Sequence, residues 1–124
     1  MPWERNDIKM DDNCLFCKII RGDVPSSKVY EDEKVFAFKD INPAAPIHIL
    51  LIPKKHISSL ADVKEEDGEL ISHMHKIVNV IAKQEGFDEN GYRLIVNCGK
   101  DAGQEVMHLH FHILSGKKLG DKIV

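Results

Sequence analysis

The 124-residue sequence lacks several features that would place it in a specialised class of protein. It has no apolar run near the roughly 18 residues that a membrane-spanning helix needs, and its longest one, PIHILLIP, contains a histidine. Its N-terminal residues are charged and show no signal-peptide pattern. Three cysteines and a net charge of -3 indicate neither a disulfide-rich secreted domain nor a general binder of nucleic acid or membranes. We therefore expect a cytoplasmic protein with no nucleic-acid or membrane partner.

The remaining pattern predicts a single α+β domain over residues 14–124, after a flexible tail at residues 1–13. A short helical turn is expected in LFCKIIRGDVP. Mainly antiparallel strands are expected at residues 28–31, 34–40, 47–53, 91–97 and 106–114. The third of these strands is apolar almost throughout, which predicts burial on both of its faces.

One long helix is predicted between the third and fourth strands. Apolar side chains recur there at helical spacing and would form one face: Leu70, Met74, Ile77, Val78 and Ile81. Asp62 and Glu65 have the spacing of a capping box at the start of such a helix, and Gly86 suits its end.

Three histidines alternate with apolar residues in HLHFHIL, residues 108–114. Neighbouring side chains of a strand point to opposite faces, so His108, His110 and His112 would share one face. The outer two would lie roughly 13 Å apart, which suits an elongated anion better than one metal ion shared by all three. An imidazole can attack or donate a proton, since its pKa of about 6.5 leaves both forms available near neutrality.

This His-φ-His-φ-His-φ-φ pattern, preceded by AGQEVM, resembles the histidine triad (HIT) superfamily of nucleotide hydrolases and transferases. CLFCKIIRGDVPSSKVYEDEKVFAFKDINPAAPIHILLIPKKHISSL and GYRLIVNCGKDAGQEVMHLHFHILSG resemble the two halves of its Hint-like branch. The resemblance implies a five-stranded, mainly antiparallel sheet with one long helix and a short N-terminal helix, continued across a homodimer. It also implies hydrolysis of purine nucleoside 5′-phosphoramidates, derivatives of AMP or GMP, without a catalytic cofactor.

The resemblance assigns roles to individual residues. His110 would be the nucleophile that attacks the α-phosphorus and forms a nucleotidyl-histidine, which water then cleaves. His112 would contact the phosphate or the leaving group, and His48 would lie beside His110 and help to orient it. The other matched positions would bind phosphate and sugar (Asn97, Gly103, Gln104, Glu105, Val106), accept from the ribose hydroxyls (Asp40), lie under the base (Ile41) and form apolar walls of the base pocket (Leu15, Phe16, Ile19).

Cys14 and Cys17 form a C-x-x-C pair, which is a weak signal by itself because both thiols can simply pack under a helical turn. Some bacterial HIT proteins bind structural zinc with such a pair, the histidine of IPKxH and the first triad histidine. The last two positions correspond to His56 and His108, and two sulfurs with two nitrogens suit tetrahedral zinc. The resemblance therefore implies a structural zinc bound by these four residues.

Other functions stay open at this point. A dinucleoside polyphosphate hydrolase of the Fhit-like branch tends to have Pro-Arg after the triad, where this chain has Ser115 and Gly116. A non-catalytic nucleotide- or zinc-binding partner protein would leave His48 and a complete triad without a role. A metal-dependent oxidoreductase would need a further ligand beside the triad. Glu105 and a C-terminal end without aromatic residues leave the leaving-group preference open.

Overall fold

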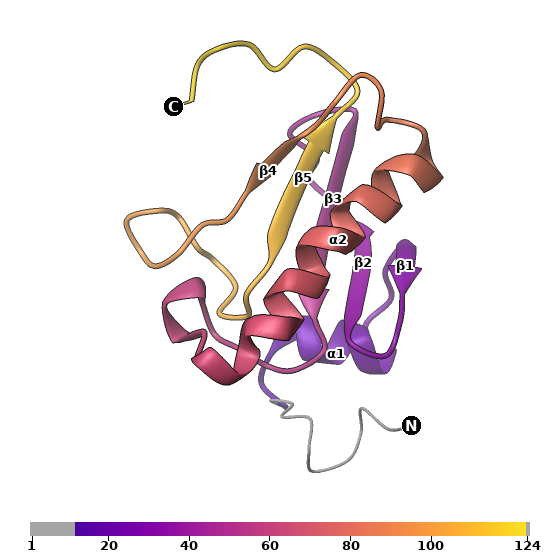
Figure 1. The fold of residues 1–124 in the computed structure, drawn as a ribbon. Helices are drawn as coiled ribbons and strands as arrows, with labels where there is room; N and C mark the ends of the chain where they lie inside the picture. Colours follow the sequence, from indigo (N-terminus) through magenta and orange to yellow (C-terminus); the bar gives the residue numbers. More distant parts are fainter. Residues whose placement is uncertain (1–11, 124) are drawn as a thin grey trace.

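A computed structural model describes residues 12–123, so most of the predicted tail lies outside the described residues. The described chain forms a five-stranded antiparallel sheet in the order β1-β2-β3-β5-β4 (Figure 1). The α+β fold with one long and one short helix is thereby confirmed. The elements are α1 (Leu15–Arg21), β1 (Lys28–Glu31), β2 (Val35–Lys39), β3 (Ile47–Pro53), two 3₁₀ turns η2 (Leu60–Asp62) and η3 (Glu65–Asp67), α2 (Gly68–Glu85), β4 (Arg93–Ile95) and β5 (Phe111–Ser115). None of the described helices has the length and apolar character to cross a membrane.

Helix α2 packs across one face of the sheet (Figure 1). The predicted apolar face of α2 is confirmed, since Met74, Ile77, Val78 and Ile81 are buried and Leu70 packs against them. They meet the alternate residues of the three central strands, namely Val35, Ala37, Ile49, Leu51, Phe111 and Ile113.

Helix α1 packs on the opposite face. Its buried residues join the other set of alternate strand residues in a second apolar cluster, which contains Phe16, Cys17, Ile19, Ile20, Phe36, Phe38, Leu50 and Ile52. Strand β3 therefore contributes to both clusters, as its continuous apolar run predicted. On this second face β5 offers His112, which lies opposite Leu50 in the register.

The last two strands are shorter than predicted. Strand β4 covers only residues 93–95, and β5 begins at Phe111, so His108 and His110 precede the ladder. The backbone N–H of Leu109 donates to the carbonyl of Ile57 (2.7 Å), which belongs to a loop rather than to a neighbouring strand. The extended alternation is nevertheless kept, because Leu109 joins the α2 cluster.

The predicted capping box of Asp62 and Glu65 is wrong. These residues belong to the two 3₁₀ turns, and α2 begins at Gly68. Asp67 directly precedes α2, and its carboxylate caps η3 by accepting from the backbone N–H of Lys64 (3.0 Å) and pairs with Lys55 (2.6 Å). The predicted end at Gly86 is confirmed by its φ of 79°, a left-handed conformation that favours glycine.

The packing of α2 gives a first prediction. Ile81 is completely buried between α2 and the sheet, so Ile81→Ala should lower the free energy of unfolding by about 2–5 kcal/mol. Urea denaturation followed by circular dichroism measures this change. Lys76→Ala, on the exposed side of the same helix, is the control and should change stability by no more than about 0.5 kcal/mol. Equal stabilities of the two variants would contradict this assignment of the core.

Candidate active site and candidate metal centre

A cavity of about 520 Å³ opens on the face of the sheet that carries α1. It is bounded by α1, the end of β2, the loop before β5 and the start of β5. All but one of the predicted substrate-binding residues line it: Leu15, Phe16, Ile19, Asp40, Ile41, Asn97, Gly103, Glu105, Val106, His110 and His112. The fold thus gathers four separate segments around one space large enough for a small organic ligand.

The cavity also has lining residues that the sequence analysis did not name: Val24, Pro25, Ser26, Phe38, Lys39 and Leu50. Phe38 and Leu50 face α1 because of the strand alternation, so their positions follow from the period-two pattern once the side of α1 is known. The segment 24–26 follows α1, and no sequence signal marked it. The lining of the cavity therefore combines apolar side chains with the rings of His110 and His112.

Gln104 is the predicted substrate-binding residue that does not line the cavity. Its side-chain amide donates to the carbonyls of Ser58 (2.8 Å) and Val106 (3.0 Å), and its Oε1 accepts from the N–H of Gly99 (3.0 Å). These bonds occupy the amide and connect the loop before β5 to the loop after β3. The side chain of Gln104 therefore holds the loop, and the ligand contact expected at this position stays a prediction.

One ring nitrogen of His110 has a defined protonation state. Its Nδ1 lies 2.7 Å from the carbonyl oxygen of His108 and must donate to it, because a carbonyl only accepts. Burial lowers the pKa of His110 below its usual value, which favours the neutral ring. A neutral ring with its proton on Nδ1 carries a lone pair on Nε2. The edge of this ring packs against Phe16, with ring centres 5.2 Å apart.

His112 has the opposite tautomer. The N–H of Ala44 donates to Nδ1 of His48 (3.0 Å), so the proton of a neutral His48 is on Nε2. That Nε2 lies 2.9 Å from Nδ1 of His112 and donates to it, which leaves the His112 proton on Nε2. Nε2 of His112 is buried and has no hydrogen-bond partner among residues 12–123. It is thus an unused donor beside the ring of His110, with ring centres 4.9 Å apart.

In this network His48 has a different hydrogen-bond partner from the one expected. The sequence analysis assigned His48 to orienting His110, whereas the hydrogen bonds connect His48 to His112 and connect His110 to the carbonyl of His108. Asp40 lies near the same group, with Oδ2 3.4 Å from Nε2 of His48. Its other oxygen accepts from the N–H of Asn42 (2.8 Å).

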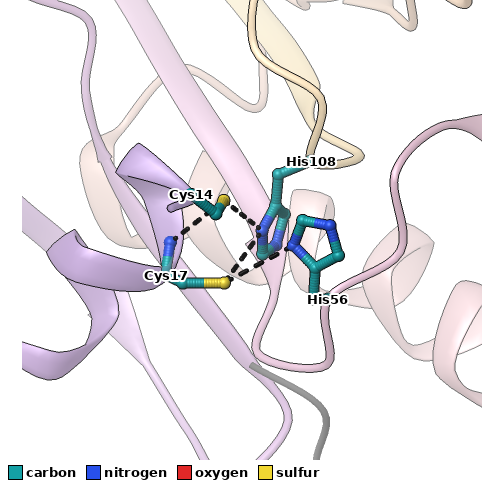
Figure 2. A group of neighbouring side chains, drawn as sticks. All are labelled: Cys14, Cys17, His56 and His108. Carbon is teal, nitrogen blue, oxygen red and sulfur yellow. Dashed lines mark hydrogen bonds between the residues drawn. The ribbon is translucent and has the colours of Figure 1, made fainter. Parts of the chain in front are cut away.

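The four predicted zinc ligands, Cys14, Cys17, His56 and His108, form a separate group. Their ligand atoms all lie within 4.8 Å of one another. Figure 2 shows Cys14 and Cys17 at the start of α1 facing His56 and His108. Sγ of Cys14 is 3.2 Å from Nδ1 of His108, and Sγ of Cys17 is 3.5 Å from Nδ1 of His56. Tetrahedral zinc holds sulfur and nitrogen ligands about 3.6 Å apart.

The chemistry of the donors also suits a metal ion. Nε2 of His108 donates to the carbonyl of Pro53 (2.8 Å), so the lone pair of Nδ1 points toward the sulfurs. Hydrogen bonds from Cys17 lower the pKa of the Cys14 thiol below its usual value, which favours the thiolate that metals bind. These four residues thus offer the two sulfur and two nitrogen donors that a tetrahedral zinc site uses.

The ring of His112 gives a prediction on stability. Burial, together with the neighbouring His110 and His48, lowers the pKa of His112 from 6.5 to about 4. Between these values the unfolded chain binds more protons than the folded chain, so stability should decrease as the pH falls from 6.5 toward 4. Urea denaturation at a series of pH values should give a shallower decrease for His112→Asn than for the wild type. The exposed His75→Asn is the control, and a wild-type slope in His112→Asn would refute the assignment.

A neutral imidazole with a free lone pair lies beside an N–H donor in a partly apolar cavity, and this arrangement can support nucleophilic chemistry on a bound ligand. Comparison with known proteins identifies the family. The HIT domain model matches residues 21–119. The purine nucleoside phosphoramidase of Escherichia coli (strain K12) is 47% identical over 111 residues, which cover 90% of this chain and 93% of that protein.

Two further matches agree with this one. The 14 kDa zinc-binding protein of Zea mays is 46% identical over 114 residues, covering 90% of this chain and 88% of that protein. The solved structure of a HIT family hydrolase from Clostridium thermocellum has a TM-score of 0.90 and 50% identity, and the match covers 93% of this chain and 100% of that one. The chain belongs to the HIT domain family, as the histidine pattern predicted. The relatives named here include hydrolases.

Proposed function

We propose that this protein hydrolyses the P–N bond of purine nucleoside 5′-phosphoramidates. The observation that carries the proposal is the hydrogen bond from Nδ1 of His110 to the carbonyl of His108, which leaves Nε2 as the nucleophilic atom at the cavity. The 47% identity to the purine nucleoside phosphoramidase of Escherichia coli supports the same choice of substrate.

In the proposed reaction, the lone pair on Nε2 of His110 forms a bond to the α-phosphorus while the P–N bond breaks. The leaving amine keeps the electron pair of that bond and takes a proton from water. His110 then carries the nucleotidyl group on Nε2, and its Nδ1–H still donates to the carbonyl of His108, which stabilises the positive ring. Water attacks the phosphorus next, releases the nucleotide and a proton, and restores His110.

His112 has a complementary role in this proposal. Its unused Nε2–H is buried beside His110 and would donate to a phosphoryl oxygen as negative charge develops there. The chain of hydrogen bonds from Ala44 through His48 keeps that proton in place, so His48 acts by orienting His112. The reaction uses protein groups and water, and it needs no catalytic cofactor.

The rest of the cavity would bind the nucleoside. Asp40 is half-buried at the cavity wall and would accept from the ribose hydroxyls. The apolar part, formed by Leu15, Phe16 and Ile19, would hold the base together with Ile41, whose side chain is 91% exposed at the cavity rim. Asn97 and the Gly103, Glu105 and Val106 positions would contact phosphate and sugar.

We also propose that Cys14, Cys17, His56 and His108 hold one structural zinc ion, which would tie α1 to the loops that follow β3 and precede β5. The zinc-binding protein of Zea mays supports this proposal.

A homodimer with a continued sheet is a further proposal. Strand β4 is at one end of the sheet order, so its outer edge has no partner strand among the described residues and is available for pairing.

The catalytic proposal is tested by replacing the nucleophile. His110→Ala should abolish hydrolysis of a fluorogenic adenosine phosphoramidate while AMP still binds, because the base and ribose contacts remain. Initial rates and calorimetric titration with AMP measure the two properties. Lys76→Ala, on the exposed side of α2, should keep wild-type rates. Near wild-type turnover by His110→Ala would exclude the covalent mechanism.

A second substrate separates the remaining alternatives. Wild-type protein that cleaves a diadenosine polyphosphate much faster than the phosphoramidate would belong functionally with the Fhit-like branch. Protein that binds AMP but cleaves neither compound would be a nucleotide-binding partner protein.

The zinc proposal makes a separate prediction. Protein purified without chelator should contain about one zinc per chain, and the double variant Cys14→Ser, Cys17→Ser should contain little, because serine hydroxyls are poor zinc ligands. Elemental analysis measures this content. Cys98→Ser changes the remaining cysteine, which is outside the cluster, and should keep the wild-type content. Well under one zinc per wild-type chain would contradict the proposal.

A further inference from the structure

His108 belongs to the group of candidate zinc ligands through its ring and to the candidate active site through its main-chain carbonyl. Its ring is completely buried, with Nδ1 3.2 Å from Sγ of Cys14 and 3.6 Å from Sγ of Cys17 (Figure 2). Its main-chain carbonyl accepts from Nδ1 of His110 at 2.7 Å. The ring and the carbonyl belong to one residue and are linked by its backbone. A shift of the ring therefore moves the carbonyl that accepts from Nδ1 of His110.

The backbone at His108 has few other constraints. The residue lies before β5 and outside the strand ladder, so the regular hydrogen bonds of the sheet do not fix it. Two contacts hold this segment: the carbonyl of Pro53, the last residue of β3, accepts from the His108 ring (2.8 Å), and the carbonyl of Ile57, in the loop after β3, accepts from the N–H of Leu109 (2.7 Å). Ligation of the ring would therefore be a major part of what fixes this segment.

Helix α1 provides a second connection between the candidate zinc ligands and the candidate active site. Cys14 caps this seven-residue helix, and Cys17 lies one turn later. Phe16, between them, packs its ring against both His108 and His110, with ring centres 5.9 and 5.2 Å apart. A helix this short is not stable alone, so its placement depends on what anchors it. The same helix supplies Leu15, Phe16 and Ile19 to the cavity.

The two sites also share part of their surface. A smaller cavity of about 290 Å³ opens beside the ligands Cys14 and His56. Leu15, Glu105 and Val106 line both this opening and the active-site cavity. A metal ion held by the four ligands would thus be separated from the nucleotide cavity by side chains that touch both spaces.

We propose that the metal centre positions the nucleophile: ligation of the His108 ring and of α1 sets the carbonyl that orients His110 and the wall that holds the nucleotide. His108 is then a positioning residue, and metal occupancy regulates the site instead of only stabilising the fold. This inference rests on the proposed function, since it concerns the same nucleophile and cavity. A purely structural metal would leave a folded metal-free protein fully active.

Linkage gives a test that needs no turnover. If the metal improves nucleotide binding, the nucleotide must improve metal binding by the same factor. The affinity of wild-type protein for zinc, measured by competition with a chromophoric chelator, should rise about fivefold or more when AMP is saturating. Uridine monophosphate at the same concentration is the control that retains the phosphate and ribose but lacks a purine base. An unchanged zinc affinity in AMP would overturn the inference.

Turnover then separates positioning from folding. Metal-free wild-type protein, shown to be folded by circular dichroism at low temperature, should lose about tenfold or more in kcat, with a smaller change in KM, and recover when zinc is added. His56→Ala should behave in the same way, because His56 binds the metal without lining the active-site cavity. His56→Cys retains a four-ligand set and should restore both zinc content and kcat. Folded metal-free protein with the same kcat as the zinc-loaded protein would also overturn the inference.

The two proposals fail in different ways. Zinc-loaded wild-type protein that hydrolyses no phosphoramidate would refute the proposed function, and the effect of AMP on zinc affinity would then decide the inference alone.

Discussion

The hydrogen bond between the carbonyl of His108 and Nδ1 of His110 is the contact on which the candidate active site depends. An imidazole has two nitrogens of similar basicity, and without a fixed partner its proton can occupy either. The carbonyl of His108 places the proton of His110 on Nδ1. The hydrogen bonds from Ala44 through His48 place the proton of His112 on Nε2. Two neighbouring rings thus acquire different chemistry, one with a lone pair and the other with a donor.

These bonds require that both rings be held on the same side of the chain, and the apolar residues between them provide this. Leu109, Phe111 and Ile113 are buried against α2, so their neighbours must face the side of α1. Burial on that side removes water from the rings, which lowers the pKa of both His110 and His112 and keeps them neutral. The packing of the core and the chemistry of the site are therefore two results of one alternating segment.

Much of the fold could be predicted from the sequence because its signals are local. The hairpin, β3 and the apolar face of α2 follow from side-chain periodicity, and the two cysteines and two histidines of the metal cluster follow from their spacing and the family resemblance. The start of α2 was mispredicted because the bond of Asp67 to Lys64 and its pairing with Lys55 override the suitable spacing of Asp62 and Glu65. The roles of His48 and Gln104 depend on which groups the fold brings within hydrogen-bond distance, and sequence spacing does not contain that information. The catalytic and ligand-binding roles themselves remain predictions.

The cluster of two cysteines and two histidines joins the first described helix to a residue near the other end of the chain, since Cys14 and His108 are 94 positions apart. During synthesis both thiols therefore leave the ribosome long before their last partner does. Helix α1 has nothing to dock against until β2 and β3 have formed, and its fourth ligand arrives only with the segment before β5. Closing so long a loop is one of the last events available to the chain, so the cavity is completed together with the sheet and cannot exist in a shorter nascent product.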